Sequence, residues 1–299
     1  MSSSRLPSTA TQRQRVAQFV AVTNATKENA QRYLRNANYN VELAANMYMN
    51  DRERKRGPDD ALNQLFDRLI GDEDRAAAGA GKSVDAIGAE SAQAYISSMG
   101  ANIENVEAFV VLEIVRADSI GQISRQGFVD GWSSIYLDHR IPADPAHHRN
   151  YVQMCIQNLP QNPAYFKKVY QFAFGLGKEP AQKALEKDVA LVFWDLFFGT
   201  ESSDTPGPRP WKSKNVDWLG AWKRFLAEKW TRSVNKDMWN QTLAFAEKAM
   251  VDETLGFWNE DQAWPGVIDD FVLWCREEGI AKAPAPGTGG GEGMDVEDY

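Results

Sequence analysis

The sequence is poor in the residues that most often carry chemistry. It has two cysteines and three histidines among 299 residues. Cys155 and Cys275 both fall in apolar helical patterns, which predicts reduced core thiols in a protein of the cytoplasm and nucleus rather than a disulfide framework. So few histidines disfavour a histidine-rich metal site and leave few candidates for acid–base catalysis. We therefore expect no catalytic residue, no metal ion and no cofactor.

Other absences exclude further classes of protein. No run approaches the roughly 20 apolar residues of a membrane-spanning helix, and the polar residues 1–7 predict no secretory signal. The net charge of −8 comes without the dense basic face of a nucleic-acid-binding protein. A Gly-rich phosphate loop and a His-Glu-x-x-His motif are also missing. We expect basic protein surfaces as partners, and neither nucleic acid nor a membrane.

Helical periodicity dominates what is present, and it predicts an all-α protein. Three short apolar stripes open the chain, with Thr26 and Asn40 placed to cap the second and third helices. They predict a three-helix module over residues 8–50. The charged residues 51–60, which contain Gly57–Pro58, predict a helix end and a linker.

A larger helical domain is expected over residues 61–280. Within it, the Ala/Gly-rich residues 71–81 are expected to form a loop, and no alternating strand pattern competes with the helical one. The Pro/Gly-rich, acidic residues 281–299 are typical of a disordered tail. The periodicity predicts helices over residues 89–99, 106–115, 125–132, 148–158, 165–175, 183–198, 216–229, 236–251 and 265–277.

One segment, residues 116–128, resembles a calcium-binding EF-hand loop that has lost its ligands. Gly121 fits the glycine of the sharp turn, and Ile123 fits the apolar position that follows. In that register Arg116 occupies the first ligand position and Asp118 is the only acid at a ligand position, whereas calcium needs several oxygen ligands. We expect the helix–loop–helix shape without a calcium site.

Four segments together resemble the defective-in-cullin-neddylation family. They are Phe-Val-Asp-Gly at residues 128–131, Tyr-Gln-Phe-Ala-Phe at 170–174, Arg-Ser-Val-Asn-Lys-Asp-Met-Trp at 232–239 and Gln-Ala-Trp-Pro-Gly-Val-Ile-Asp-Asp-Phe-Val at 262–272. The resemblance covers nearly the whole chain. It implies a ubiquitin-associated (UBA)-like module to about residue 50, followed by an all-helical potentiating-neddylation (PONY) domain with EF-hand-like folds that lack calcium sites.

The resemblance also implies a function. Members of the family act as scaffold-type ligase components that hold the C-terminal region of a cullin and the modifier-charged conjugating enzyme together, and the thioester chemistry stays with that enzyme. The gain is proximity and orientation. The alternative is a ubiquitin receptor or shuttle that works mainly through the UBA-like module.

The family's cullin site, carried over by motif, falls on Asp237, Ala263 and Asp269. Asp237 is expected in the first turn of a helix, and Asp269 beside the buried stripe of the last helix. Asp270 is turned about 100° around that helix, so we expect Asp269 to make the contact. Without the resemblance, both acids would be read as partners of a helix N-terminus.

A second implied site is an apolar pocket for the acetylated N-terminal Met of the conjugating enzyme. Acetylation removes a charge that is costly to bury unpaired. Ile123 and Leu176 stand where many relatives carry Phe, and aliphatic residues at helical spacing are usually core. The implied residues are Val111, Leu112, Ile123, Leu176 and Leu196.

Ubiquitin binding by the first module is left open by the sequence. UBA domains commonly carry a Met-Gly-Phe/Tyr loop after their first helix, whereas residues 22–26 here read Val-Thr-Asn-Ala-Thr. Val22 and the methionines at residues 47–49 are the apolar side chains that a ubiquitin contact would need.

Overall fold

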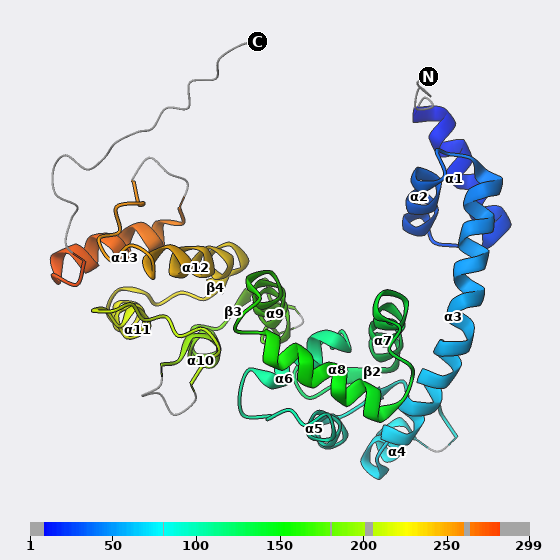
Figure 1. Cartoon of the computed structure of the whole chain (residues 1–299), viewed down its shortest axis with the longest axis horizontal. Helices are drawn as coiled ribbons and strands as arrows, with labels where there is room; N and C mark the ends of the chain where they lie inside the picture. Colours follow the sequence, from blue (N-terminus) through cyan, green and yellow to red (C-terminus); the bar gives the residue numbers. More distant parts are fainter. Residues whose placement is uncertain (1–8, 80, 180, 201–205, 260–263, 282–299) are drawn as a thin grey trace. The chain divides into compact units, whose positions relative to one another are not determined.

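A computed structural model shows the protein as a set of helices joined by loops and by very short strands (Figure 1), which confirms the all-α expectation. It describes residues 9–79, 81–179, 181–200, 206–259 and 264–281, with backbone alone for residues 50–58. Over these residues no helix has the length and apolar character to cross a membrane. The elements are α1 (Thr9–Thr23), α2 (Lys27–Asn36), α3 (Val41–Leu69), α4 (Asp72–Ala78), β1 (Ala86–Ile87), α5 (Ala89–Ser98), α6 (Glu107–Ile114), β2 (Ile123–Ser124), α7 (Arg125–His139), α8 (Pro145–Asn158), α9 (Pro163–Leu176), β3 (Ala184–Leu185), α10 (Lys187–Phe198), α11 (Trp218–Lys229), β4 (Val234–Asn235), α12 (Lys236–Ala249) and α13 (Gly266–Glu277).

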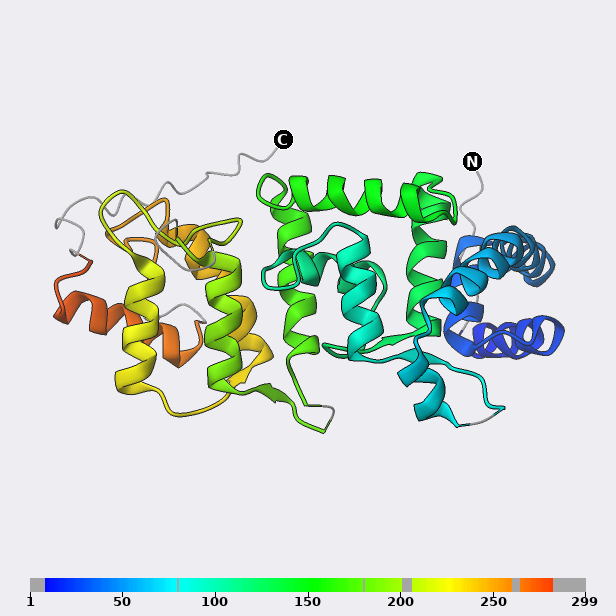
Figure 2. The same ribbon diagram turned by 90° about the horizontal axis from the view of Figure 1, so that it is seen from below.

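The chain divides into two compact units. The first unit comprises Met1–Arg68 and Trp132–Ala143, and the larger unit comprises Leu69–Gly131 and Asp144–Tyr299. In the larger unit, α10, α11, α12 and α13 lie together as one group of helices in both views (Figures 1 and 2). This grouping brings the two helices that carry the predicted cullin-binding acids into the same unit.

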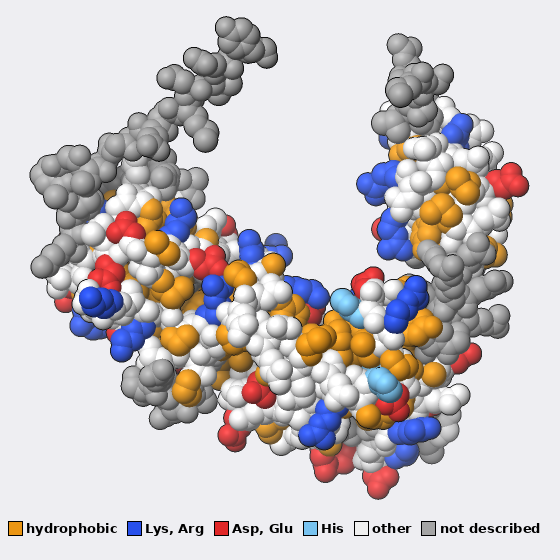
Figure 3. Space-filling view, in the orientation of Figure 1, with side chains coloured by type: hydrophobic (Ala, Val, Ile, Leu, Met, Phe, Trp, Pro, Cys, Tyr) orange, Lys and Arg blue, Asp and Glu red, His pale blue; other side chains and the backbone are white. Residues whose placement is uncertain are grey.

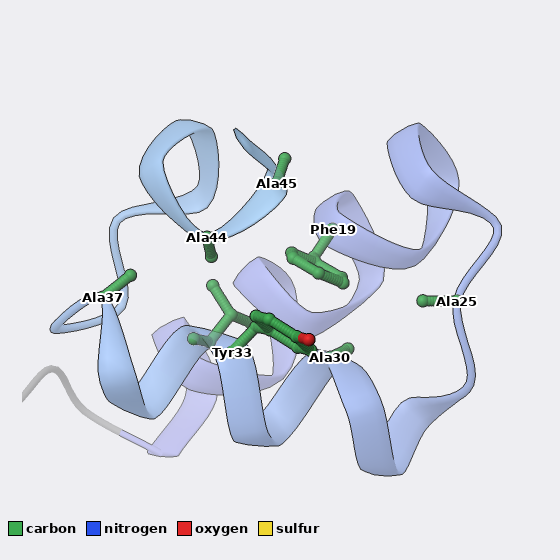
Figure 4. Packing of buried hydrophobic residues seen from close by; sticks show 8 residues of the cluster. Phe19, Ala25, Ala30, Tyr33, Ala37, Ala44 and Ala45 are labelled. Atoms are coloured by element: carbon green, nitrogen blue, oxygen red, sulfur yellow. The ribbon is translucent and has the colours of Figure 1, made fainter. Parts of the chain in front are cut away.

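The small module consists of α1, α2 and the start of α3. Its core is built on aromatic rings: Phe19 stacks on Tyr33 with centroids 6.4 Å apart, and Tyr48 meets Tyr33 edge-on at 5.3 Å. Small side chains let the helices approach these rings closely (Figure 4). The buried members are Phe19, Ala25, Ala30, Tyr33, Leu34, Ala37, Ala44 and Ala45.

Both predicted helix caps of the small module are confirmed. Thr26 accepts a hydrogen bond from the backbone N–H of Asn29 at 3.3 Å, and the Asn40 Oδ1 accepts one from the N–H of Leu43 at 3.0 Å. Each cap satisfies a donor that the first turn of a helix leaves unpaired. Each therefore fixes where a helix of the module starts.

The expected helix break at Gly57–Pro58 is wrong, because α3 runs without interruption from Val41 to Leu69. A proline inside a helix costs about 3 kcal/mol, a penalty that tertiary packing can outweigh. Beyond the proline, Leu62 and Phe66 are buried, and Ser133 of α7 donates a hydrogen bond to the Asp59 carboxylate. The domain boundaries at residues 50, 60 and 280 stay predictions.

The larger unit contains helix–loop–helix segments joined in pairs by short strands. β1 pairs antiparallel with β2, with Ile87 opposite Ile123, and β3 pairs antiparallel with β4, with Leu185 opposite Val234. A helix follows each strand closely, namely α5, α7, α10 and α12. This is the layout of two EF-hand pairs, as the residues around Gly121 predicted for one of the loops.

Residues 71–81 are not simply a loop, since α4 spans Asp72–Ala78. The Asp74 carboxylate accepts hydrogen bonds from Gly71 N at 2.9 Å, Gly88 N at 2.7 Å and Ser91 Oγ at 2.6 Å. It thereby closes the first turn of α4 and ties it to the start of α5. The alanines that suggested a loop are also the strongest helix formers.

An aromatic cluster joins α9, α10 and α12. The rings of Tyr170 and Trp239 stack with centroids 4.3 Å apart, and Trp194 Nε1–H donates to the Tyr170 hydroxyl at 2.9 Å. That hydroxyl donates to the Trp239 carbonyl at 2.9 Å. All three side chains are fully buried, so the start of α12 rests on a rigid base.

Replacing Gly131 by Ala is expected to destabilise the fold. A Cβ at Gly131 would lie well inside contact distance of the Ile114 carbonyl oxygen, where α7 crosses the end of α6. Overpacking of this kind costs about 1–3 kcal/mol. Gly175→Ala in α9 is the control, because nothing lies within 4 Å of its Cβ position and the change should stabilise by about 0.4–1 kcal/mol. Urea unfolding measures both, and equal stabilities would contradict the close crossing.

Candidate functional site

Asp237 lies where the sequence placed it, exposed in the first turn of α12. β4 leads directly into this helix, and the Asn235 side chain caps it by accepting a hydrogen bond from Met238 N at 2.8 Å. Met238 and Trp239 are buried on the other side of the turn. Since Asn235 already caps the helix, the Asp237 carboxylate is available to a partner.

Asp269 lies in the first turn of α13 and is half-buried. Ile268, Phe271 and Val272 are buried beside it, so the predicted buried stripe of this helix is confirmed. Trp258 Nε1–H donates a hydrogen bond to the Asp269 Oδ1 at 2.8 Å. This bond fixes the orientation of the carboxylate.

Trp258 is a residue that the sequence reasoning missed. The residue is 7% exposed, and the guanidinium carbon of Arg276 lies over its ring, 4.8 Å from the centroid. A cation over an indole face is attracted by the ring electrons. Trp258 thus links the first and last turns of α13 to the segment before it. It lies outside the helices, so no periodic pattern marks it.

The rest of the predicted acidic site is only partly visible. Ala263 lies outside the residues that the structure describes. Asp270 is exposed and helps to line a hollow of about 340 Å³ between α11 and α13, together with Lys229 and Glu277. Asp269 is not among the lining residues of that hollow. The neighbouring residues Asp269 and Asp270 therefore lie in different environments: Asp269 is hydrogen-bonded to Trp258, and Asp270 faces the hollow between α11 and α13.

The five residues of the predicted acetyl-Met pocket all lie in the larger unit. Val111 and Leu112 of α6, Ile123 of β2 and Leu176 of α9 are 0%, 2%, 0% and 4% exposed. Leu196 of α10 is half-buried, and Val192, one turn before it, is 56% exposed. Four of the five side chains are thus core in this structure. The pocket stays a prediction, and α10 is where a peptide could enter.

The small module presents apolar side chains to solvent. Val22 is 68% exposed at the end of α1, and Leu43 and Met49 of α3 are 50% and 43% exposed. The sequence places Leu43 in the apolar stripe of the third helix, together with Ala44 and Met47, and its expected burial there is wrong. Exposed apolar residues mark a protein contact where they form one continuous patch.

The chemistry of the thiols fits core positions. Burial raises the pKa of the Cys275 thiol to about 12, and burial also raises the pKa of Cys155. Both groups are therefore protonated near neutral pH, and a protonated thiol is a much poorer nucleophile than a thiolate. Within the described part of the chain, no group of three or more His, Cys, Asp or Glu side chains is placed to hold a metal ion.

Known proteins match the chain along most of its length. Residues 147–274 match the family described as cullin binding, and residues 13–55 match the family described as a UBA-like domain. Defective in cullin neddylation protein 1 of Pyricularia oryzae is 40% identical over 288 residues, covering 93% of this chain and 98% of that protein. The proteins of the same name from Mycosarcoma maydis and Saccharomyces cerevisiae are 28% and 22% identical, and the alignments cover 87% and 88% of this chain and 93% of each relative.

Proposed function

This chain belongs to the defective-in-cullin-neddylation family, and on that basis we propose that it promotes cullin neddylation as a scaffold-type ligase component. It holds a cullin and the modifier-charged conjugating enzyme together. The observation that carries the proposal is the match to the cullin-binding family over residues 147–274, a range that contains Asp237 and Asp269. In a reconstituted reaction, adding the protein should raise the initial rate of cullin modification; an unchanged rate would contradict the proposal.

The physical basis of the proposal is proximity. Two proteins that bind each other weakly in solution react slowly, whereas two proteins bound to one scaffold encounter each other at an effective concentration in about the millimolar range. Such tethering can raise apparent affinity by about 10²–10⁴ without any new contact between the reactants. The thioester and the attacking lysine then belong to the partners, and the scaffold supplies orientation.

The cullin side of the scaffold rests on charge. Asp237 is exposed and Asp269 is held by Trp258, so a basic cullin surface finds one accessible and one pre-oriented carboxylate. Hydrogen bonds between a carboxylate and a cationic side chain are about twice as strong as neutral ones. Pre-orientation lowers the entropy lost on binding. We propose that the two acids contribute in these different ways.

The enzyme side rests on apolar burial. An acetylated Met of the conjugating enzyme enters beside Leu196, where the exposed Val192 extends the apolar surface of α10. Burying a Met side chain contributes about 1.5–3 kcal/mol relative to leaving it in water. Insertion deeper, toward Leu176 and Ile123, requires these buried side chains to move apart.

A ubiquitin receptor is the second candidate function. The observation that favours it is the exposed apolar set Val22, Leu43 and Met49 on the small module. Leu43→Asp distinguishes the two roles in the intact chain. A receptor loses its activity with this change, whereas the proposed scaffold retains cullin stimulation.

Replacing both cysteines by Ala is expected to leave the stimulation of cullin modification largely unchanged. Cys155 and Cys275 are buried, and the raised pKa of each thiol keeps it protonated. Reaction rates of the double variant are compared with the unmodified protein after circular dichroism has verified folding. A thioester trapped on either cysteine, detected as a reductant-sensitive adduct on a gel, would overturn the scaffold mechanism.

A further inference from the structure

A groove on the small module lies apart from the contacts proposed so far. It runs between α1 and α2 and has a volume of about 950 Å³. Val16, Ala17 and Val20 of α1 form apolar parts of its lining. Val22, Leu43 and Met49 are not part of the lining. The groove is therefore a separate surface of the module.

The rims of this groove are basic. Arg13 borders it on α1, and Lys27 and Arg35 border it on α2, all three exposed. Lys27, Gln31 and Arg35 follow one another at four-residue spacing, so they form a ridge along one side of α2. Within the described residues, no ion pair within 4.0 Å engages Arg13, Lys27 or Arg35. Lys and Arg side chains lie next to hydrophobic ones on the face of the module seen in Figure 3.

An apolar floor with cationic rims selects an acidic segment that also carries apolar side chains. Such a segment lies at residues 292–299, with the sequence Glu-Gly-Met-Asp-Val-Glu-Asp-Tyr. It has four carboxylate side chains and three large apolar ones, and residues 283–299 contain no Lys or Arg. Residues 1–8, which precede α1, contain no acid and so lack the charge that the rims require.

We propose that the groove between α1 and α2 binds residues 292–299 of this chain. Met294, Val296 and Tyr299 supply the apolar side chains for the floor, and the acids of the segment face Arg13, Lys27 and Arg35. The contact is independent of the scaffold function, because neither Asp237 nor α10 takes part in it. Because the segment and the groove belong to one chain, binding within the chain depends on an effective concentration and not on the concentration of the protein.

Tethering decides the design of the test. If the segment alone binds with a Kd on the order of 100 μM, about ten intact chains have their groove filled for each one that is open. The receptor is therefore a chain that ends at residue 286, and the probe is a fluorescent peptide of residues 287–299. Fluorescence polarisation should show saturable binding to the shortened chain and about tenfold weaker binding to the intact chain.

The groove itself is tested by charge reversal in the shortened chain. Arg13→Glu with Arg35→Glu should weaken peptide binding at least about tenfold and flatten its salt dependence, because two attractive charges become repulsive. Arg68→Glu with Arg140→Glu is the matched control, because both are exposed cations of the first unit that do not line the groove. Circular dichroism shows whether each variant keeps its fold.

The peptide variants separate recognition from general charge attraction. Met294→Ser with Val296→Ser keeps every carboxylate and should still lose most of the affinity. Equal binding of this peptide, equal binding by the Arg13/Arg35 variant, or no binding up to about 1 mM would each overturn the proposal. Size-exclusion chromatography of the intact chain distinguishes a contact within one chain from one between two copies, and either arrangement supports occupation of the groove by residues 292–299.

Discussion

Asp237→Lys combined with Asp269→Asn is expected to weaken cullin binding about 30-fold, a loss of about 2 kcal/mol. Breaking a hydrogen-bonded charge pair in a desolvated interface costs about 2–5 kcal/mol. The lower end applies here because Asp237 is exposed in the free protein, and exposed pairs are weakened by solvent. Most of the loss is expected from Asp269, whose carboxylate Trp258 holds in place.

The two substitutions are chosen to leave the fold intact. At position 269, Asn keeps an oxygen that accepts the hydrogen bond from Trp258 Nε1, whereas Lys would break it. Position 237 is exposed, and the helix retains its Asn235 cap. Asp188→Lys is the matched control, because Asp188 is an exposed acid in the first turn of α10, close behind β3 as Asp237 is behind β4.

Binding is measured by isothermal titration calorimetry with the C-terminal region of a cullin. The Asp188 variant should bind like the unmodified protein, although it carries the same change of charge as Asp237→Lys alone and likewise removes an acid from the first turn of a helix. Unchanged affinity in the Asp237/Asp269 variant would reject the acidic site. Equal losses in both variants would mean that net charge alone attracts the cullin.

An acetylated N-terminal peptide of the conjugating enzyme is expected to bind at least tenfold more tightly than the same peptide with a free amine. Tenfold corresponds to about 1.4 kcal/mol. A buried ammonium group loses its hydration and must find a carboxylate, and none of Val111, Leu112, Ile123, Leu176 and Leu196 has one. Fluorescence polarisation with the two peptides measures the difference.

Leu196→Asp should remove this preference while leaving cullin binding unchanged. Leu196 is partly exposed, and Val192, one turn before it, is exposed. The carboxylate of an Asp at position 196 can therefore reach solvent and need not be buried in the core. Val251→Asp is the control, because Val251 is 88% exposed beyond the end of α12. Equal affinities of the two peptides for the unmodified protein would mean that the five predicted residues are ordinary core and that the enzyme docks elsewhere.

The sequence predicted helices well where burial follows a helical period. Helices α5, α6, α9 and α13 begin and end within two residues of their predicted limits. Two errors have one cause, since tertiary contacts outweighed local signals. α3 continues through Pro58, where a break was predicted, and α7 continues beyond its predicted end at residue 132 to His139. In this added part of α7, Ser133 donates a hydrogen bond to Asp59 of α3. Strands of two residues are too short to carry an alternating pattern.

The candidate site was predictable in part. Motif and periodicity placed Asp237 and Asp269 in first turns, which the structure bears out. The hydrogen bond from Trp258 to Asp269 was not predictable, because it joins a residue outside the helices to α13 and leaves no repeat in the sequence. The sequence also could not decide whether the five pocket residues are core residues or line a groove, since both kinds share the same aliphatic pattern.

The dependence of the cullin modification rate on the concentration of this protein tests the scaffold most directly. A scaffold that bridges two partners raises the rate until the concentration of the scaffold exceeds the concentrations of both partners. Beyond that point cullin and charged enzyme occupy separate copies, and the ternary complex is diluted. The account therefore predicts a bell-shaped curve. Asp237→Lys with Asp269→Asn, which weaken cullin binding about 30-fold, should lower the maximum of this curve and move it to a higher concentration of the protein. A rate that rises to a plateau and stays there, with the protein in large excess over both partners, would contradict bridging.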